Sequence, residues 1–173
     1  LPIWLTEEEK TRLDEIGKNF TPTDPPVGTV RNIAEFEPQE GVLVRYPPGL
    51  PYNLIVQMSQ YIKVVTVVSS SYLSTAQTNY QNNGVNMANC EFIVAPTDTY
   101  WIRDYGPWFV AVNNEVGIVD FPYNRPRPND DEVPIEVANY FGIDHWGMDL
   151  VATGGNYMTD GLGQSASTDL IYD

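Results

Sequence analysis

Three apolar runs in the first half of the chain have the composition of β-strands. Residues 63–68 are β-branched and nearly all apolar, as in a strand that is buried on both faces. Residues 41–46 and 90–94 are similar runs, and Pro47-Pro48 ends the earlier one. Apolar positions 54, 55, 58 and 62 recur at helical spacing, which predicts a helix over residues 52–61. A second helix is predicted over residues 72–82.

The second half of the chain alternates short strands with turns. Residues 108–112 and 116–120 are predicted strands, joined by a hairpin turn at Asn113-Asn114. A helix over residues 131–140 accommodates Pro134 in its first turn. A short strand over residues 150–152 and a hairpin around residues 160–163 follow, and residues 168–173 have the pattern of a strand or its edge.

The N-terminal 40 residues differ from the rest. Thr6 and Glu9 have the spacing of a capping box, which predicts a helix over residues 6–16. Residues 20–38 are rich in Pro and Thr and are predicted to be a loop or an extended arm. With 173 residues, the chain has the size of one domain. The element order predicts a mixed α/β fold, with strand–helix modules over residues 41–173 after the helix and arm of residues 1–40.

Charge excludes two classes of partner. The chain has 23 Asp and Glu against 9 Lys and Arg, for a net charge of −14. Nucleic acids and anionic membranes both attract clustered Lys and Arg, so neither is an expected partner. The single cysteine, Cys90, gives no information on the redox compartment. The 13 Gly and 14 Pro indicate a loop-rich protein, which weakly favours secretion or the cell surface.

Residues 98–108 hold the densest set of aromatic and charged side chains. A structural corner is one interpretation, with Asp104 bonded to turn amides or paired with Arg103 while Gly106-Pro107 turns the chain. The other is a cation site, since a carboxylate can hold a guanidinium by paired hydrogen bonds while an indole such as Trp101 stacks on it.

Arg125 and Arg127 form a second candidate group. The prolines after them favour extended backbone, so both side chains can lie on one side of the chain. They are either neutralised by Asp130 and Asp131 on a solvated loop, or they form a fork for a carboxylate. With the cation site, such a fork suits a ligand with a guanidinium or ammonium at one end and a carboxylate at the other.

Other candidates favour structural roles. Gly154-Gly155-Asn156 lacks the spacing of a phosphate loop, and paired glycines are frequent where chain or ligand comes close. Cys90 has the setting of a small buried hydrophobe, with a catalytic thiol as the less favoured interpretation. His145 is expected to be a loop histidine. The spacing of His, Cys and Asp matches no metal site.

Two of these segments carry a resemblance to a known family. Trp101-Ile102-Arg103-Asp104-Tyr105-Gly106-Pro107-Trp108, followed by Gly154-Gly155-Asn156-Tyr157-Met158-Thr159-Asp160-Gly161, resembles the Porphyromonas-type peptidylarginine deiminase and agmatine deiminase family. The resemblance implies part of a pentein, an α/β propeller of strand–helix modules around a central site. It implies that Asp104 binds the substrate guanidinium with Trp101 packed beside it, and that no cofactor is needed. Residues expected to shape the site are Arg103, Gly106, Gly154, Gly155, Asn156 and Asp160.

Within the family, the Arg125-Pro126-Arg127 pair resembles the peptidylarginine branch, which holds the free carboxylate of a C-terminal arginine. The implied reaction converts that arginine to citrulline and ammonia through a covalent cysteine adduct. The chain departs from the family because it contains no His-x-Asp, and because Cys90 and His145 precede the positions of the family's cysteine and histidine. We therefore expect the leading portion of a longer enzyme, cut at Asp173, inactive alone and completed by a C-terminal remainder that supplies both groups.

Two alternatives stay open. Agmatine deiminase, a cytoplasmic enzyme of putrescine synthesis, acts on a guanidino substrate that lacks a carboxylate. A non-catalytic module that binds arginine-like ligands is the alternative from another class.

Overall fold

The structure is a computed structural model that describes residue 2 and residues 4–168. The chain divides into two compact units. The inserted unit is Pro38–Ile102, and the flanking unit is Leu1–Glu37 with Arg103–Asp173. Each unit is described by itself below. None of the helices in the described part of the chain is both long and apolar enough to cross a membrane.

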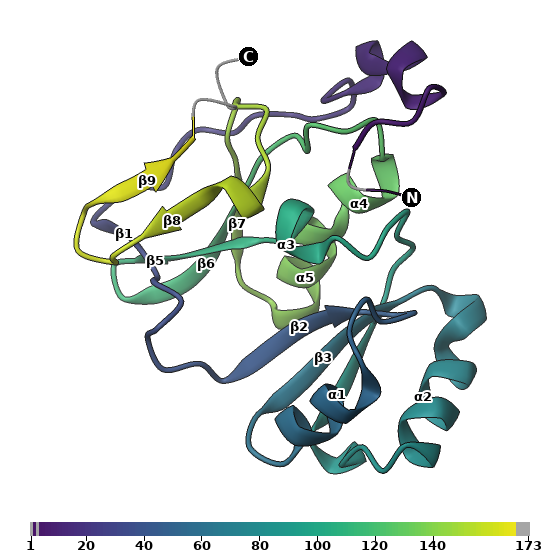
Figure 1. The fold of residues 1–173 in the computed structure, drawn as a ribbon. Helices are drawn as coiled ribbons and strands as arrows, with labels where there is room; N and C mark the ends of the chain where they lie inside the picture. Colours follow the sequence, from purple (N-terminus) through teal and green to yellow (C-terminus); the bar gives the residue numbers. More distant parts are fainter. Residues whose placement is uncertain (1, 3, 169–173) are drawn as a thin grey trace. The chain divides into compact units, whose positions relative to one another are not determined.

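The inserted unit is a parallel sheet with two helices (Figure 1). Its strands pair in the order β2-β3-β4, both pairs parallel. One core cluster joins Val44 and Val64 of the sheet to Ile55 and Tyr80 of the helices, so both helices cover the same face. The elements are β2 (Gly41–Arg45), α1 (Tyr52–Ser59), β3 (Lys63–Val68), η3 (Ser70–Tyr72), α2 (Leu73–Asn82), η4 (Met87–Asn89) and β4 (Cys90–Val94).

The flanking unit is built on a mixed sheet of four strands in the order β1-β5-β6-β7. Only the β6–β7 pair is parallel. Asn113 and Asn114 have φ of 52° and 73°, so they make the tight turn that the sequence predicted between β5 and β6. The strands are β1 (Val30–Asn32), β5 (Trp108–Val112), β6 (Glu115–Asp120) and β7 (Asp144–Gly147).

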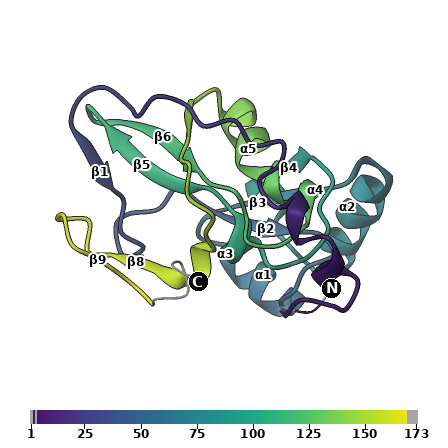
Figure 2. The same ribbon diagram turned by 90° about the horizontal axis from the view of Figure 1, so that it is seen from above.

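Two elements lie on opposite sides of this sheet. Helix α5 contacts β6 and β7, and the β8–β9 hairpin lies on the other side (Figures 1 and 2). The predicted hairpin is therefore confirmed, and so is the mixed α/β class. The remaining elements are η1 (Glu9–Thr11), η2 (Leu13–Glu15), α3 (Ile102–Tyr105), α4 (Pro128–Asp131), α5 (Val133–Phe141), η5 (Gly154–Asn156), β8 (Tyr157–Thr159) and β9 (Ser165–Ser167).

The predicted N-terminal helix is wrong in type. The capping box forms, because the Thr6 amide donates to Glu9 Oε2 at 2.8 Å and the Glu9 amide donates to Thr6 Oγ1 at 3.2 Å. The segment nevertheless folds as two 3₁₀ turns, η1 and η2, separated by Arg12 in a non-helical conformation. Its apolar face is too small to favour a longer helix by packing.

Four other predictions need correction. The predicted arm contains β1, and the segment around His145 is strand β7 rather than a loop. Both strands are polar and short, and their pairing with β5 and β6 creates them. The strand predicted over residues 150–152 is a single bridge between Ala152 and Tyr123. The helix predicted over residues 131–140 is preceded by a separate turn, α4.

Some predictions stay predictions. The strand over residues 168–173 lies almost entirely outside the described residues, which end at residue 168. The propeller, the boundary near residue 40 and the cut at Asp173 also remain expectations.

Candidate functional site

Asp104 is a half-buried carboxylate in the short helix α3. Burial raises its pKa above the usual 3.8, because the charged form loses solvation. The Thr153 side chain donates a hydrogen bond to the carboxylate, and the nearby charges of Arg125 and Arg127 also favour its ionised form. The carboxylate is therefore partly desolvated, and its hydrogen bond and the nearby positive charges offset part of the cost of burying its charge.

The paired glycines lie directly against this helix. A Cβ at Gly154 would overlap the backbone oxygen of Arg103, and a Cβ at Gly155 would overlap Oδ1 of Asp104. The chain therefore comes close at the glycines, as their pairing suggested. This contact brings two of the three sequence segments together within the flanking unit.

An aromatic cluster follows Asp104 in the chain. Trp108 stacks on Tyr157 with ring centroids 4.6 Å apart and contacts Phe121 at 4.4 Å. The Tyr157 hydroxyl accepts a hydrogen bond from Asn32 at 2.5 Å. Trp108 and Tyr157 line an open groove of about 730 Å³ between the four-stranded sheet and the β8–β9 hairpin. Thr153 lines it as well, but Asp104 is not among its lining residues.

Arg127 is almost fully buried rather than solvated. Its Nε donates to Glu9 Oε1 at 2.6 Å and its Nη2 donates to the Pro2 carbonyl oxygen at 2.7 Å. The side chains of Arg127 and Glu9 are 1% and 4% exposed. Arg125 is half-buried, and its Nη1 donates to the Asn124 carbonyl oxygen at 2.9 Å. The structure therefore does not present the two arginines as one open fork.

Trp101 belongs to the inserted unit. Its indole contacts the Tyr100 ring at 4.6 Å, with 37° between the ring planes. Its amide donates to Thr99 Oγ1 at 3.3 Å. A role for Trp101 beside a guanidinium therefore stays a prediction.

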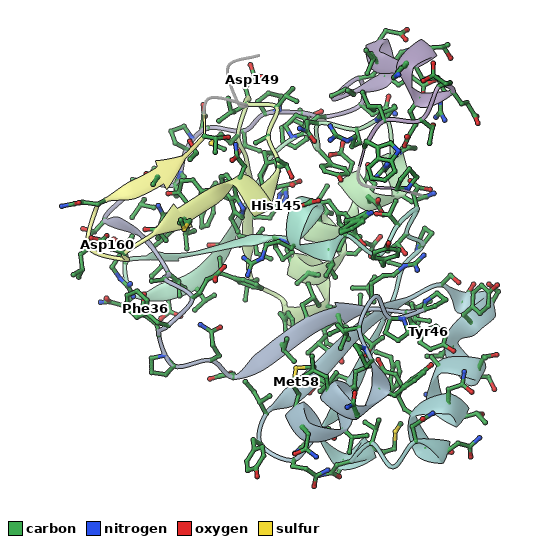
Figure 3. The ribbon with its side chains drawn as sticks, in the orientation of Figure 1. Phe36, Tyr46, Met58, His145, Asp149 and Asp160 are labelled. Carbon is green, nitrogen blue, oxygen red and sulfur yellow. The ribbon has the colours of Figure 1, made fainter. Side chains whose placement is uncertain are left out.

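The other residues that were predicted to shape the site make contacts close to their own positions in the fold. Arg103 forms an exposed ion pair with Glu35, and Gly106 is buried before β5. Asn156 accepts a hydrogen bond from Thr168 Oγ1 at 2.7 Å. Asp160 lies at the turn of the β8–β9 hairpin (Figure 3). Its carboxylate accepts from two backbone amides of that turn, which lowers its pKa.

Cys90 and His145 lack the settings of catalytic groups. Cys90 is half-buried at the start of β4, and burial raises the pKa of its thiol, whereas a nucleophilic cysteine needs a lowered one. His145 Nε2 lies 3.2 Å from Oδ2 of the buried Asp120. Burial lowers the pKa of His145 and raises that of Asp120 to about 7.

Sequence reasoning missed two residues of this region. Thr153 carries no signal in the sequence, because a lone threonine before a Gly-Gly pair has many possible roles. Glu9 was interpreted only as half of a capping box. That motif leaves one carboxylate oxygen unassigned, and the oxygen goes to Arg127.

The fold is a mixed α/β arrangement, and the Asp104 carboxylate is half-buried beside Thr153 and Gly155. A family model for Porphyromonas-type peptidyl-arginine deiminase matches residues 31–171. The chain therefore belongs to this family, whose members are hydrolases of guanidino groups.

Solved structures have the same fold. An agmatine deiminase of Enterococcus faecalis matches with a TM-score of 0.69 and 24% identity, over 86% of this chain and 48% of that one. A protein provisionally named an agmatine deiminase matches with a TM-score of 0.72 and 22% identity, over 81% and 44%. A provisionally named arginine deiminase from Porphyromonas gingivalis matches with a TM-score of 0.65 and 17% identity, over 82% and 47%. The chain thus spans less than half of each of these structures.

Proposed function

We propose that this chain forms part of an enzyme that hydrolyses the guanidinium group of a C-terminal peptidyl arginine to citrulline and ammonia. The observation that carries the proposal is the match to the peptidyl-arginine deiminase family over residues 31–171, which include Asp104 and both arginines. The half-buried Asp104 carboxylate, beside the donor Thr153, supports its role as the guanidinium ligand.

The proposed chemistry needs a nucleophile and a proton carrier besides Asp104. A cysteine thiolate adds to the central guanidinium carbon, and the tetrahedral adduct expels ammonia after a histidine protonates it. Water, deprotonated by the same histidine, then adds to that carbon, and loss of the thiolate leaves citrulline. Cys90 and His145 do not suit these roles, so the proposal assigns both to polypeptide outside these residues, within a pentein propeller. No cofactor takes part.

The substrate's other groups have proposed partners as well. Trp101 packs on the guanidinium, and the free carboxylate is bound at the turn from Arg125 to Arg127. The net charge of −14 supports a cationic substrate, because it favours approach of a guanidinium. We propose a secreted or cell-surface location for this activity, where peptide ends are available.

Citrulline formation from a peptide that ends in arginine tests the proposal in the full-length protein. Asp104→Asn keeps the size of the side chain but removes its charge, so kcat/KM should fall by about 100-fold or more. Asp14→Asn, an exposed acid in the same unit, is the matched control and should leave turnover unchanged. Wild-type turnover by Asp104→Asn would remove Asp104 from the site. The 173-residue chain alone should form no citrulline.

Agmatine deimination is the second candidate. The similarity to solved agmatine deiminases favours it, and the cytoplasm would then be the expected location. Arg125→Ala separates the two, because agmatine has no carboxylate for Arg125 to bind. Loss of activity on the peptide alone supports the peptidyl enzyme, whereas equal loss on agmatine supports the alternative.

A further inference from the structure

The groove between the four-stranded sheet and the β8–β9 hairpin has an apolar floor. Trp108 of β5, Val119 of β6 and Trp146 of β7 are register partners, so they form one row across three strands. The side chains of paired residues lie on the same face of a sheet, and all three residues line the groove. A Cβ at Gly117 of β6 would overlap the Trp146 ring, so this indole lies over the neighbouring strand.

Two segments form the walls of the groove. The arm before β1 is held against β7, because the Thr23 amide donates to the Gly147 carbonyl oxygen at 3.0 Å and the Gly147 amide donates to Thr23 Oγ1 at 3.1 Å. The hairpin is held by the stacking of Tyr157 on Trp108. The volume of about 730 Å³ lies in the range of pockets that hold small ligands. The arm supplies Pro22, Pro25 and Pro26, and the hairpin supplies Tyr157, Ser165 and Ser167.

Thr153 joins the groove to the Asp104 carboxylate. Its side chain donates a hydrogen bond to Asp104, and the same residue lines the groove. Gly154 and Gly155, the next two residues, lie against helix α3, which carries Asp104. The groove and the carboxylate are therefore neighbours within the flanking unit. A peptide whose arginine reached Asp104 would have its preceding residues close to the groove.

We propose that this groove is a subsite for the peptide that precedes the target arginine, and that it selects apolar side chains there. The inference rests on the proposed function, because only a peptidyl substrate has such residues. Indole, phenol and proline rings present rigid apolar surface, so an apolar side chain gains from being buried against them. Among the described residues that line the groove, Asp149 alone is charged, so the groove offers little to a charged side chain.

The experiment uses two peptides that end in arginine and differ only in the residue before it, which is leucine in one and serine in the other. Both peptides carry the same guanidinium and the same free carboxylate. The readout is the ratio of their kcat/KM values, leucine over serine, in the full-length protein. The wild type should prefer the leucine peptide by about 10- to 100-fold, as expected for an apolar side chain in an apolar pocket.

Two variants change the groove and leave Asp104 and Thr153 in place. Trp146→Leu removes an indole from the floor. Leu150→Ser removes an apolar side chain that lines the groove and is 37% exposed, so it should fold even if Trp146→Leu does not. Each variant should lower the ratio by about threefold or more. Phe141→Ser is the matched control, since Phe141 is 42% exposed at the end of α5, on the other side of the sheet, and this variant should keep the wild-type ratio.

A third substrate separates the inference from the proposed function. N-acetylarginine has no preceding residue, so the two groove variants should change its kcat/KM much less than that of the leucine peptide. An equal loss on all three substrates would mean that the groove packs against the enzyme's own polypeptide instead of the substrate.

Two other results would also overturn the inference. A wild-type enzyme that does not distinguish the two peptides would mean that the groove does not select the preceding side chain. A wild-type preference that both groove variants retain would mean that this side chain is recognised elsewhere. All of these results leave the proposed function standing, whereas a full-length protein that forms no citrulline from any of the three substrates would refute the proposed function itself.

Discussion

Oδ1 of Asp104 lies against the backbone of Gly155, and the space between them does not admit a Cβ. The contact joins helix α3 to the 3₁₀ turn η5, which lie about 50 residues apart in the sequence. Gly155 therefore fixes the place of the carboxylate, and any larger residue must displace one of the two.

Gly155→Ala should impair activity more than stability. The added methyl group pushes the Asp104 carboxylate aside, and a displacement of this size can lower kcat/KM by about 100-fold. Overpacking should lower the free energy of unfolding by only about 1–3 kcal/mol. Citrulline assays and urea unfolding of the full-length protein measure the two effects.

Gly163→Ala is the matched control. Gly163 has φ of 102°, and an added Cβ would have no neighbour within 4 Å, so this change strains the backbone without touching the site. It should lower stability and leave kcat/KM near the wild-type value. If Gly155→Ala behaves in the same way, the contact with Asp104 has no part in activity.

Thr153→Val should shift the pH dependence of activity. Burial raises the pKa of Asp104, and the hydrogen bond from Thr153 opposes that rise. Valine has a similar shape but no donor, so the pKa of Asp104 should rise further. Because only the ionised carboxylate binds a guanidinium, activity lost as pH falls should be lost at a higher pH in the variant. The acid limb of kcat/KM against pH measures the shift.

Thr153→Ser tests the cause of that shift. Serine retains the donor, so its acid limb should stay close to that of the wild type. An acid limb that moves equally in both variants would indicate a packing effect of the lost methyl group instead.

Local signals in the sequence predicted most of the elements. The Asn113-Asn114 turn has the positive φ values that its residues favour, and the run Lys63–Val68 is the central, buried strand of its sheet. The capping box also forms, with both of its hydrogen bonds. In each case, the residues that carry the signal also make the interaction.

The misses share a different cause. Strands β1 and β7 consist of Val-Arg-Asn and Asp-His-Trp-Gly, which have little strand preference of their own. Partner strands distant in the sequence create them. The same limit applies to the site, where the sequence marks Asp104 as a candidate and its guanidinium-binding role stays a prediction. Its contacts with Thr153 and Gly155, and the burial of Arg127 by Glu9, depend on long-range packing.

Cys90→Ala should leave activity unchanged. The Cys90 thiol is half-buried, with Sγ 3.5 Å from the Asn86 carbonyl oxygen, and burial raises its pKa. Alanine should lower the free energy of unfolding by about 1 kcal/mol, as expected for loss of a partly buried group. Citrulline formation by the variant measures whether Cys90 takes part in activity. A loss of about 100-fold or more at an unchanged melting temperature would make Cys90 the nucleophile.

The raised pKa of Asp120 predicts how the free energy of unfolding depends on pH. Its side chain is 1% exposed, and burial, with the nearby charges of Asp131 and Glu132, raises its pKa to about 7 from the usual 3.8. The native state therefore binds the proton more tightly than the unfolded state does. The contribution of this proton to the free energy of unfolding is fully present below about pH 4 and is lost as pH rises to about 7. About three pKa units correspond to at most about 4 kcal/mol.

Asp120→Asn removes this dependence. Its amide oxygen can still accept from the Phe121 amide, as Oδ1 of Asp120 does at 2.7 Å, and its NH₂ group can donate to neutral His145. The variant should be more stable than the wild type at about pH 8 by about 1–4 kcal/mol, and similar to it at about pH 4. Asp131, whose pKa burial raises to about 6, is present in both proteins, so its burial contributes to both and only its repulsion with Asp120 differs between them. Urea unfolding of the full-length protein across this range measures the difference, with Glu115→Gln, an exposed change in the same strand, as the control.

A difference between Asp120→Asn and the wild type that does not grow with pH would mean that Asp120 is ionised throughout, with its charge balanced by protonated His145.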